Sequence, residues 1–232
     1  MTEAVQYQLE GEVAVISMDD GKANALSHEI LAALDEALDR AEQEAKAVVL
    51  AGRPGRFSAG FDLKTMTSSP ENARALLKRG GEVYMRLFAL PMPLVIACTG
   101  HALAGGCLTL LCGDVRIGVE GPFKLGMNEV AIGMPLPILA VELVRARVRP
   151  QQLDEATLFA RIYSPEEACA AGMLTDVVDG ESLMPAAMRQ AQELAKLNTH
   201  AYAESKARLR GRTVDYILDT LDSDLATFGA IG

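Results

Sequence analysis

The sequence has few of the features that would suit a secreted or membrane-bound protein. It contains four cysteines, and no two of them form a Cys-x-x-Cys pair. We therefore expect reduced, mostly buried thiols and no disulfide framework. No apolar run approaches the ~20 residues of a membrane-spanning helix, and the first residues lack the basic and apolar regions of a secretion signal. These absences predict a cytoplasmic protein without a membrane partner.

Positive charge and histidine are also scarce. Acidic residues number 31 and basic residues 22, which gives a net charge of −9. Such a chain repels nucleic acid phosphates, so an anionic ligand would need a local basic group. The three histidines are His28, His101 and His200. Their spacing fits neither a shared metal ion nor a nucleophile relay, so we expect no metal. The negative net charge predicts that the protein has no nucleic-acid partner.

The apolar pattern predicts an α/β fold. A chain of 232 residues suits one compact domain, because cores usually divide only beyond about 250–300 residues. Short apolar runs predict strands at residues 5–9, 13–18, 47–51, 94–98 and 115–119. Helical patterns separate most of these strands, which is typical of crossover units. One such helix begins after Ser27, a favourable N-cap, and the pattern after Pro135 is mainly helical.

Two segments with small residues follow predicted strands, where α/β sheets tend to bind ligands. Gly105-Gly106 opens an apolar helical run, so its free amides would point toward a neighbouring group. Ala59-Gly60 provides a second loop of small residues. Two amides from different loops can hold one oxygen, and removing one such donor typically costs ~3–4 kcal/mol of transition-state stabilisation. The alternative for these glycines is a tight turn with close packing.

Glu129 is the candidate base. Met127 precedes it and Val130, Ala131 and Ile132 follow, so we expect its carboxylate to be partly desolvated and its proton affinity raised. A base of this kind, facing an oxyanion site, suits removal of a proton next to a thioester carbonyl. A glutamate on a surface loop is the alternative.

Five segments together resemble the crotonase superfamily, also called the enoyl-CoA hydratase/isomerase family. They follow the family's order over nearly the whole chain, at residues 22–26, 57–63, 100–114, 126–133 and 171–178. The resemblance implies a spiral core of repeated ββα turns and a C-terminal helical trimerisation region, with trimers or pairs of trimers. We accordingly expect a crotonase-like core over residues 1–190 and a helical annex over residues 191–232, within a single functional unit.

The resemblance also implies a site for an acyl-CoA substrate, with coenzyme A as part of the substrate and no separate cofactor. It places the oxyanion hole at the amides of Ala59 and Gly105, with Glu129 as the base. The residues that it implies for substrate binding are Lys22, Ala23, Ala25, Ala59, Gly60, Phe61, Asp62, Leu63, Gly105 and Asn128. The basic side chains expected near the phosphates are Lys22, Arg53 and Arg56.

Within the family, hydratases use two glutamates to hold a water molecule, and one of them belongs just after the glycine helix start. Leu108 occupies that position here and cannot transfer a proton. The segments 104–108 and 126–129 look like the Δ3,Δ2-enoyl-CoA isomerase branch. The resemblance therefore implies that Glu129 moves a 3-enoyl-CoA double bond to the 2-trans position through a stabilised dienolate, in fatty acid or related acyl-CoA metabolism.

Other functions stay open at this point. The same oxyanion site would serve an enoyl-CoA hydratase or another acyl-CoA lyase or hydrolase. A non-catalytic oligomer that only binds acyl-CoA is a further alternative. Two residues that resemble catalytic groups have structural interpretations: Asp62 is placed to cap the following helix, and Cys107 to pack in the core.

Overall fold

The computed structural model describes residues 4–227, so the outer ends of both expected regions, 1–3 and 228–232, lie outside the described residues. Within the described residues, three sheets form the β structure. Their strands are β1 (Val5–Glu10), β2 (Val13–Met18), β3 (Ala25–Leu26), β4 (Ala47–Ala51), β5 (Gly55–Ser58), β6 (Gly60–Phe61), β7 (Leu94–Cys98), β8 (Gly100–Leu103), β9 (Val115–Val119), β10 (Leu125–Gly126) and β11 (Asp176–Val178). All five strands expected from apolar runs are present.

The largest sheet has the order β1-β2-β4-β7-β9-β11. Its first pair is antiparallel and the other pairs are parallel. Every residue of β4 and β7 is buried, as expected for parallel strands that are covered on both faces. The predicted α/β class is therefore confirmed.

The chain advances by repeating a strand, a second strand and a helix. The successive strands β4, β7 and β9 lie in the large sheet, whereas β5, β8 and β10 form a second sheet of three strands. The repeated ββα turns implied by the family resemblance are therefore present, whereas the apolar pattern alone predicted a simpler alternation of strand and helix. The apolar pattern missed the second strands because they are short, with four, four and two residues, and lack an apolar run.

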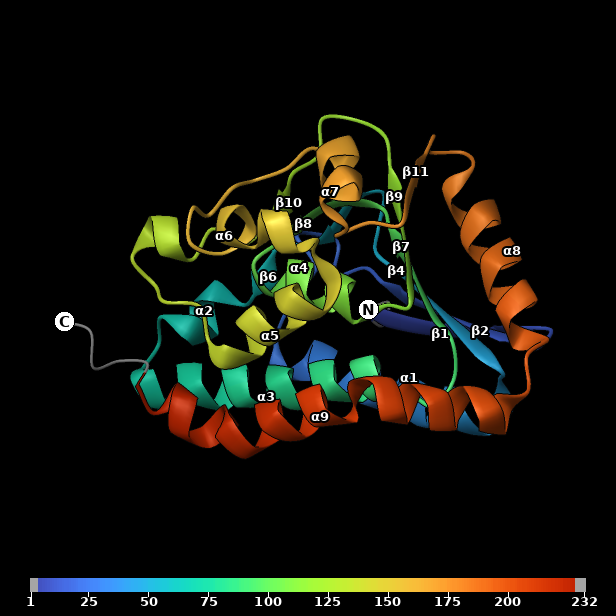
Figure 1. Ribbon diagram of the computed structural model, residues 1–232, viewed down its shortest axis with the longest axis horizontal. Helices are drawn as coiled ribbons and strands as arrows, with labels where there is room; N and C mark the ends of the chain where they lie inside the picture. The colour runs from blue at the N-terminus through green and yellow to red at the C-terminus, as the bar shows by residue number, and fades with distance from the viewer. Residues whose placement is uncertain (1–3, 228–232) are drawn as a thin grey trace.

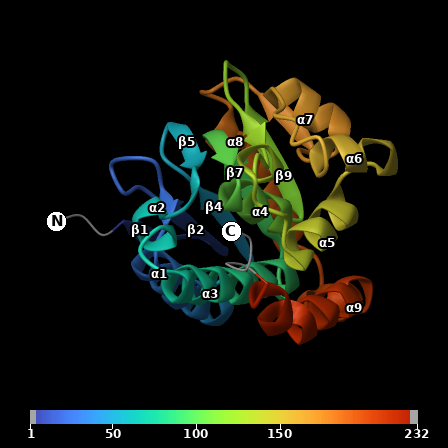
Figure 2. The ribbon, with the colours of Figure 1, turned by 90° about the vertical axis from the view of Figure 1, so that its left-hand side faces the viewer.

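Helices cover both faces of the large sheet (Figures 1 and 2). They are α1 (His28–Glu44), α2 (Leu63–Met66), α3 (Pro70–Ala89), α4 (Gly105–Cys112), α5 (Ile138–Arg147), α6 (Leu153–Ala156), α7 (Pro165–Ala171), α8 (Leu183–Ala195) and α9 (Thr199–Leu225), with short 3₁₀ turns η1 (Val130–Ile132) and η2 (Pro150–Gln152). The apolar face of α8 packs on one side of the sheet, and α1, α3 and α4 share the core on the other side.

Local capping explains where several helices begin. The Ser27 hydroxyl accepts a hydrogen bond from the Ile30 amide at 3.3 Å, which confirms the expected cap of α1. Asp62 likewise accepts from the Thr65 amide at 2.8 Å and caps α2. Its structural role is confirmed.

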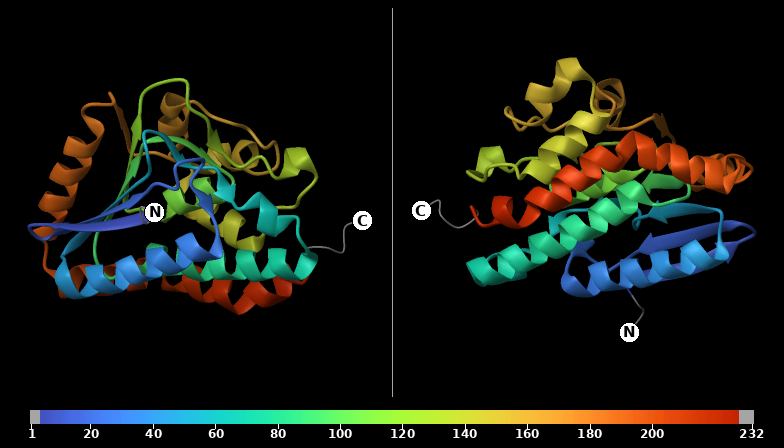
Figure 3. Two further views of the ribbon diagram at one scale, coloured as in Figure 1. Left: turned by 180° about the vertical axis from the view of Figure 1, so that it is seen from behind. Right: turned by 60° about the horizontal axis from the view of Figure 1, so that its bottom comes forward.

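The C-terminal third is mainly helical, as expected, with β11 as its extended segment. The long helix α9 lies alongside α3 (Figure 3). The expected division after residue 190 falls within α8, and the separation into core and annex stays a prediction, as does trimerisation. None of the helices within residues 4–227 has the length and apolar character needed to cross a membrane.

Candidate active site

The two glycine segments that the sequence brought forward meet in the structure. Gly60, in β6, has a φ of +94°, and a Cβ added to it would stand 3.0 Å from the Gly105 nitrogen. Gly105 is the first residue of α4, where helical amides have no partner within the helix. A side chain at position 60 would therefore crowd the amide at the start of α4, and glycine leaves that space open.

The peptide groups around Gly105 are held in place by specific contacts. The carbonyl of Gly105 accepts hydrogen bonds from Tyr84 Oη at 2.9 Å and from Thr109 Oγ1 at 3.0 Å. Its neighbour Ala104 has a φ of +50°, an uncommon value for a residue with a side chain. Strained backbone of this kind persists only where its surroundings hold it, and it is frequent at functional sites.

The amide of Ala59 does not match our expectation that it helps to form an oxyanion site. It donates to the Ala23 carbonyl at 3.0 Å, so it already has a partner. Three residues after Ala59, the Asp62 amide donates to the Leu26 carbonyl of β3 at 3.1 Å. Because successive amides of an extended strand point to opposite edges, the amide of Phe61 is directed away from β3.

Glu129 lies between Gly126, at the end of β10, and the 3₁₀ turn η1. Its side chain is half-buried, and the buried oxygen Oε2 has no hydrogen-bond partner among the described residues. Burial raises the pKa of Glu129 above its ordinary value, and the amides of Glu129 and Asn128 oppose this rise only in part. The carboxylate is therefore desolvated and has an oxygen available to accept a proton.

Glu129 acts electrostatically on residues beside the start of α4. Burial raises the pKa of Cys107, and the charge of Glu129 is the next largest cause. Burial also raises the pKa of Tyr84, again with a smaller contribution from Glu129. Cys107 is fully buried, which confirms that it packs in the core. Leu108 is also buried, and no residue from Gly105 to Cys112 is acidic, so α4 supplies no second carboxylate.

Asn24 organises the loop before β3, a role that our sequence analysis missed. It is fully buried with a φ of +51°. Its amide nitrogen donates to the carbonyls of Met18, Arg56 and Phe57 at 2.8, 3.2 and 3.2 Å. Asn24 thus joins the 20–25 loop to β5. An asparagine within a Gly-Lys-Ala-Asn segment is compatible with such a turn, but its distant partners cannot be read from the sequence.

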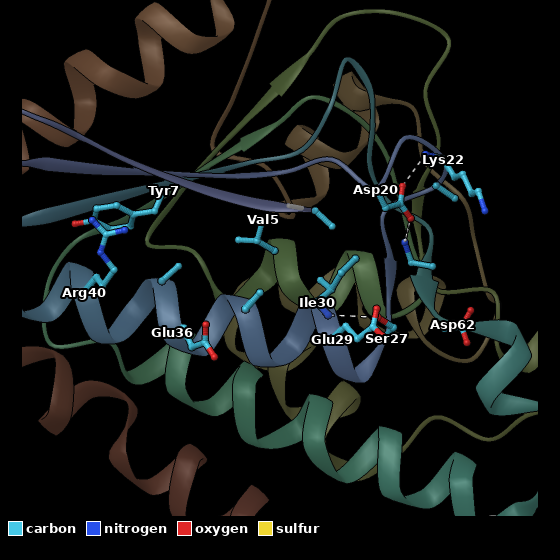
Figure 4. A pocket seen from close by; sticks show the side chains of 15 residues that line it. Val5, Tyr7, Asp20, Lys22, Ser27, Glu29, Ile30, Glu36, Arg40 and Asp62 are labelled. Atoms are coloured by element: carbon cyan, nitrogen blue, oxygen red, sulfur yellow. Dashed lines mark hydrogen bonds between the residues drawn. The ribbon is translucent and has the colours of Figure 1, made fainter. Parts of the chain in front are cut away.

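A hollow of about 680 Å³ lies beside this loop. Lys22, Ala23, Ala25 and Asp62 contribute to its lining, so the structure brings these four expected binding residues together (Figure 4). At the other end of the hollow, Arg40 lies over the Tyr7 ring, 4.0 Å from its centroid. The other expected residues, including Gly105, Glu129 and the 75% exposed Leu63, are not part of this lining.

The basic residues expected near phosphates differ in their surroundings. Arg53 donates to the Lys22 carbonyl at 2.6 Å and lies 3.4 Å from an Asp19 carboxylate oxygen. The guanidinium of Arg53 therefore helps to hold the loop. Lys22 and Arg56 are exposed.

Comparisons with known proteins agree with this fold. A family model described as enoyl-CoA hydratase/isomerase matches residues 8–231. Human mitochondrial enoyl-CoA delta isomerase 1 is 29% identical over 221 residues, which cover 93% of this chain and 73% of the relative. A putative enoyl-CoA hydratase from Thermus thermophilus is 35% identical over 195 residues, covering 80% and 76%.

The crystal structure of human mitochondrial delta3-delta2-enoyl-CoA isomerase has a TM-score of 0.93 to this chain. Its identity is 29%, and the match covers 97% of this chain and 90% of the human chain. This chain belongs to the enoyl-CoA hydratase/isomerase family and has the crotonase fold. Relatives named isomerase and relatives named hydratase are both similar to it, so the reaction has to be argued from the site.

Proposed function

We propose that this protein is a Δ3,Δ2-enoyl-CoA isomerase, which converts a 3-enoyl-CoA into the 2-trans-enoyl-CoA. One observation carries the proposal. Glu129 presents a desolvated carboxylate with a free buried oxygen, whereas Leu108 and the rest of α4 provide no second carboxylate. One carboxylate suffices to move a proton, but a hydratase of this family also has to hold and activate water.

The reaction needs only a proton shuttle and a site for negative charge. The Glu129 carboxylate removes a proton from C2, and the electron pair of that C–H bond delocalises into the thioester carbonyl to give a dienolate. The same carboxylic acid then returns the proton to C4, which leaves the double bond between C2 and C3. No atom is gained or lost, so the reaction needs no cofactor beyond the coenzyme A of the substrate.

The oxygen of the dienolate is assigned to two backbone amides. Gly105 provides the amide at the start of α4, where the helix dipole also favours negative charge. For the second donor we assign Phe61 in place of Ala59, because the Ala59 amide is bonded to Ala23. Donors that are fixed before the reaction stabilise charge as it develops and need no reorganisation.

The remaining expected residues are assigned to binding. Lys22, Ala23, Ala25 and Asp62 line the hollow along which the coenzyme A portion would extend. Gly60 belongs to β6, and Leu63 and Asn128 lie close in sequence to β6 and Glu129, where the thioester and acyl chain would lie. Ala59 is exposed and stays assigned to the binding path, although its amide is already bonded to the Ala23 carbonyl.

A homotrimer or a pair of trimers is proposed for the assembly. The helix α9 exposes large apolar side chains in Leu209, Tyr216 and Leu218, which are 78%, 49% and 45% exposed. Such side chains suit contact with another subunit. Sedimentation equilibrium tests this assembly, and a monomeric mass would contradict it.

Hydration of 2-enoyl-CoA is the second candidate, favoured by the 35% identity to the Thermus thermophilus protein named putative enoyl-CoA hydratase. Parallel assays of 3-enoyl-CoA isomerisation and 2-enoyl-CoA hydration with the unmodified protein separate the two. We expect isomerisation to dominate. Binding of acyl-CoA without turnover of either substrate would support the non-catalytic alternative.

The decisive variant is Glu129→Gln, which keeps the side-chain shape and removes the base. We expect the isomerisation kcat to fall at least ~100-fold, in line with the usual contribution of a general base, while coenzyme A thioester binding persists. The matched control is Glu120→Gln, because Glu120 is an exposed glutamate that follows β9. Unchanged turnover in Glu129→Gln would remove Glu129 from its assigned role.

A further inference from the structure

The ring of Phe61 fills a space that exists only because α3 carries a glycine beside it. A Cβ added at Gly80 would stand 2.3 Å from Cε1 and 2.4 Å from Cζ of Phe61. These distances are far shorter than real carbon contacts, so the Phe61 ring lies directly against the Gly80 backbone. Phe61 is half-buried, and its backbone is part of β6.

The other edge of the same ring lies against the start of α4. A Cβ added at Gly105 would stand 3.0 Å from both Cδ2 and Cε2 of Phe61 and 2.7 Å from Tyr84 Oη. The Phe61 and Tyr84 rings also contact each other, with centroids 5.9 Å apart and planes inclined by 57°. The Phe61 ring is therefore a spacer between Gly80 on α3 and Gly105 on α4.

Tyr84 connects both ends of this arrangement. It lies on α3 one turn after Gly80, is 1% exposed, and donates to the Gly105 carbonyl at 2.9 Å. Gly80 and Tyr84 together thus determine where α3 holds the Phe61 ring and the Gly105 peptide. Phe61 and Gly105 carry the two amides to which we assigned the dienolate oxygen.

We propose that Gly80 is a positioning residue for the oxyanion site, and this inference rests on the proposed function. The missing side chain admits the Phe61 ring, and the seated ring fixes the distance between the amides of Phe61 and Gly105. A methyl group at position 80 would displace the ring, and with it the Phe61 backbone. Misplacing a catalytic group by about 1 Å can cost ~100-fold in rate.

The test compares Gly80→Ala with Gly81→Ala. The neighbouring Gly81 is on the same helix, but a Cβ there would meet the flexible end of Leu221 at 3.0 Å and would not touch Phe61. Both variants gain the same helix propensity. We expect kcat for 3-enoyl-CoA to fall ~100-fold in Gly80→Ala, with KM changed less than about threefold. Gly81→Ala should keep the kcat of the unmodified protein.

A double variant separates positioning from general damage to the fold. Phe61→Leu removes the two ring atoms that a methyl group at position 80 would strike, and it retains the Phe61 backbone amide. We expect Gly80→Ala/Phe61→Leu to recover at least ~10-fold in kcat over Gly80→Ala alone. An unchanged kcat in Gly80→Ala, or no recovery in the double variant, would overturn the proposal.

A binding measurement distinguishes this inference from the proposed reaction. Acetoacetyl-CoA forms an enolate that needs the two amides, whereas butyryl-CoA does not. We expect Gly80→Ala to weaken the binding of acetoacetyl-CoA at least ~10-fold more than the binding of butyryl-CoA. Only acetoacetyl-CoA, as its enolate, places negative charge on the thioester oxygen. Absence of 3-enoyl-CoA turnover in the unmodified protein would contradict the proposed function alone. Equal loss of binding affinity for both thioesters in Gly80→Ala would contradict the positioning role of Gly80.

Discussion

Asp114 and Lys206 form a buried ion pair between the start of β9 and the N-terminal third of α9, with Nζ 2.8 Å from Oδ2. Their side chains are only 10% and 5% exposed. Arg210, one turn further along α9, contacts the other carboxylate oxygen at 2.5 Å. One carboxylate therefore holds two cations of the long C-terminal helix against the end of the sheet.

Asp114→Asn should destabilise the protein by about 3–5 kcal/mol, because it leaves two buried cations without their counter-charge. Urea denaturation measures this change in the free energy of unfolding. The control is Asp222→Asn, which removes an ion pair between Asp222 and Lys78. The side chains of this pair are 74% and 46% exposed, respectively. Exposed pairs contribute about 0–1 kcal/mol, and an equal loss in both variants would contradict the buried role.

The stability difference should also depend on pH. Burial alone would raise the pKa of Asp114, but the charges of Lys206 and Arg210 outweigh it and lower the pKa below its ordinary value of 3.8. A lowered carboxyl pKa adds stability above the unfolded value and loses it as the pH falls through the folded value. The gap between the unmodified protein and Asp114→Asn should therefore narrow below about pH 3.8.

The activity should show an acid limb that belongs to Glu129. Burial raises the pKa of this carboxyl above 4.5, and only the ionised form can remove a proton. The value of kcat/KM for 3-enoyl-CoA should therefore increase with pH, with a midpoint above pH 4.5, and then level off. The measurement is kcat/KM as a function of pH. A parallel acid-unfolding curve ensures that the loss of activity at low pH is not due to unfolding. A profile that stays flat down to pH 4.5 would show that another group limits the reaction.

Leu108→Glu should add hydration to the activity of this site. The new carboxylate would lie on α4, in the place of the Leu108 side chain, which is 3% exposed. With Glu129 it would provide the two acceptors that a bound water needs, so we expect hydration of 2-enoyl-CoA to rise at least ~10-fold above that of the unmodified protein.

Leu108→Gln is the control for this variant, because glutamine has nearly the same shape and no charge. Hydration that stays at the unmodified level in Leu108→Glu would show that the missing carboxylate is not the only obstacle. A rise in Leu108→Gln equal to that in Leu108→Glu would show that polarity alone admits water.

The strands of the large sheet were predictable because burial leaves a mark in the sequence. Residues 47–51 and 94–98 are apolar throughout, since both faces of these parallel strands are covered. The N-caps Ser27 and Asp62 were also predictable, because a cap bonds to an amide three residues along the chain. Short strands such as β8 were not, because their pairing partners are distant in the sequence.

By itself, the sequence determined the class of fold, the carboxylate at Glu129, the glycines at the start of α4 and the absence of an acid at Leu108. These depend on residue type and local spacing. Tertiary structure alone decided that the Ala59 amide is bonded to Ala23, that the Phe61 amide is directed away from β3, and that the Phe61 ring rests on Gly80. The physical reason is that strand register and close packing set the direction of a backbone amide, and both arise from segments far apart in the chain.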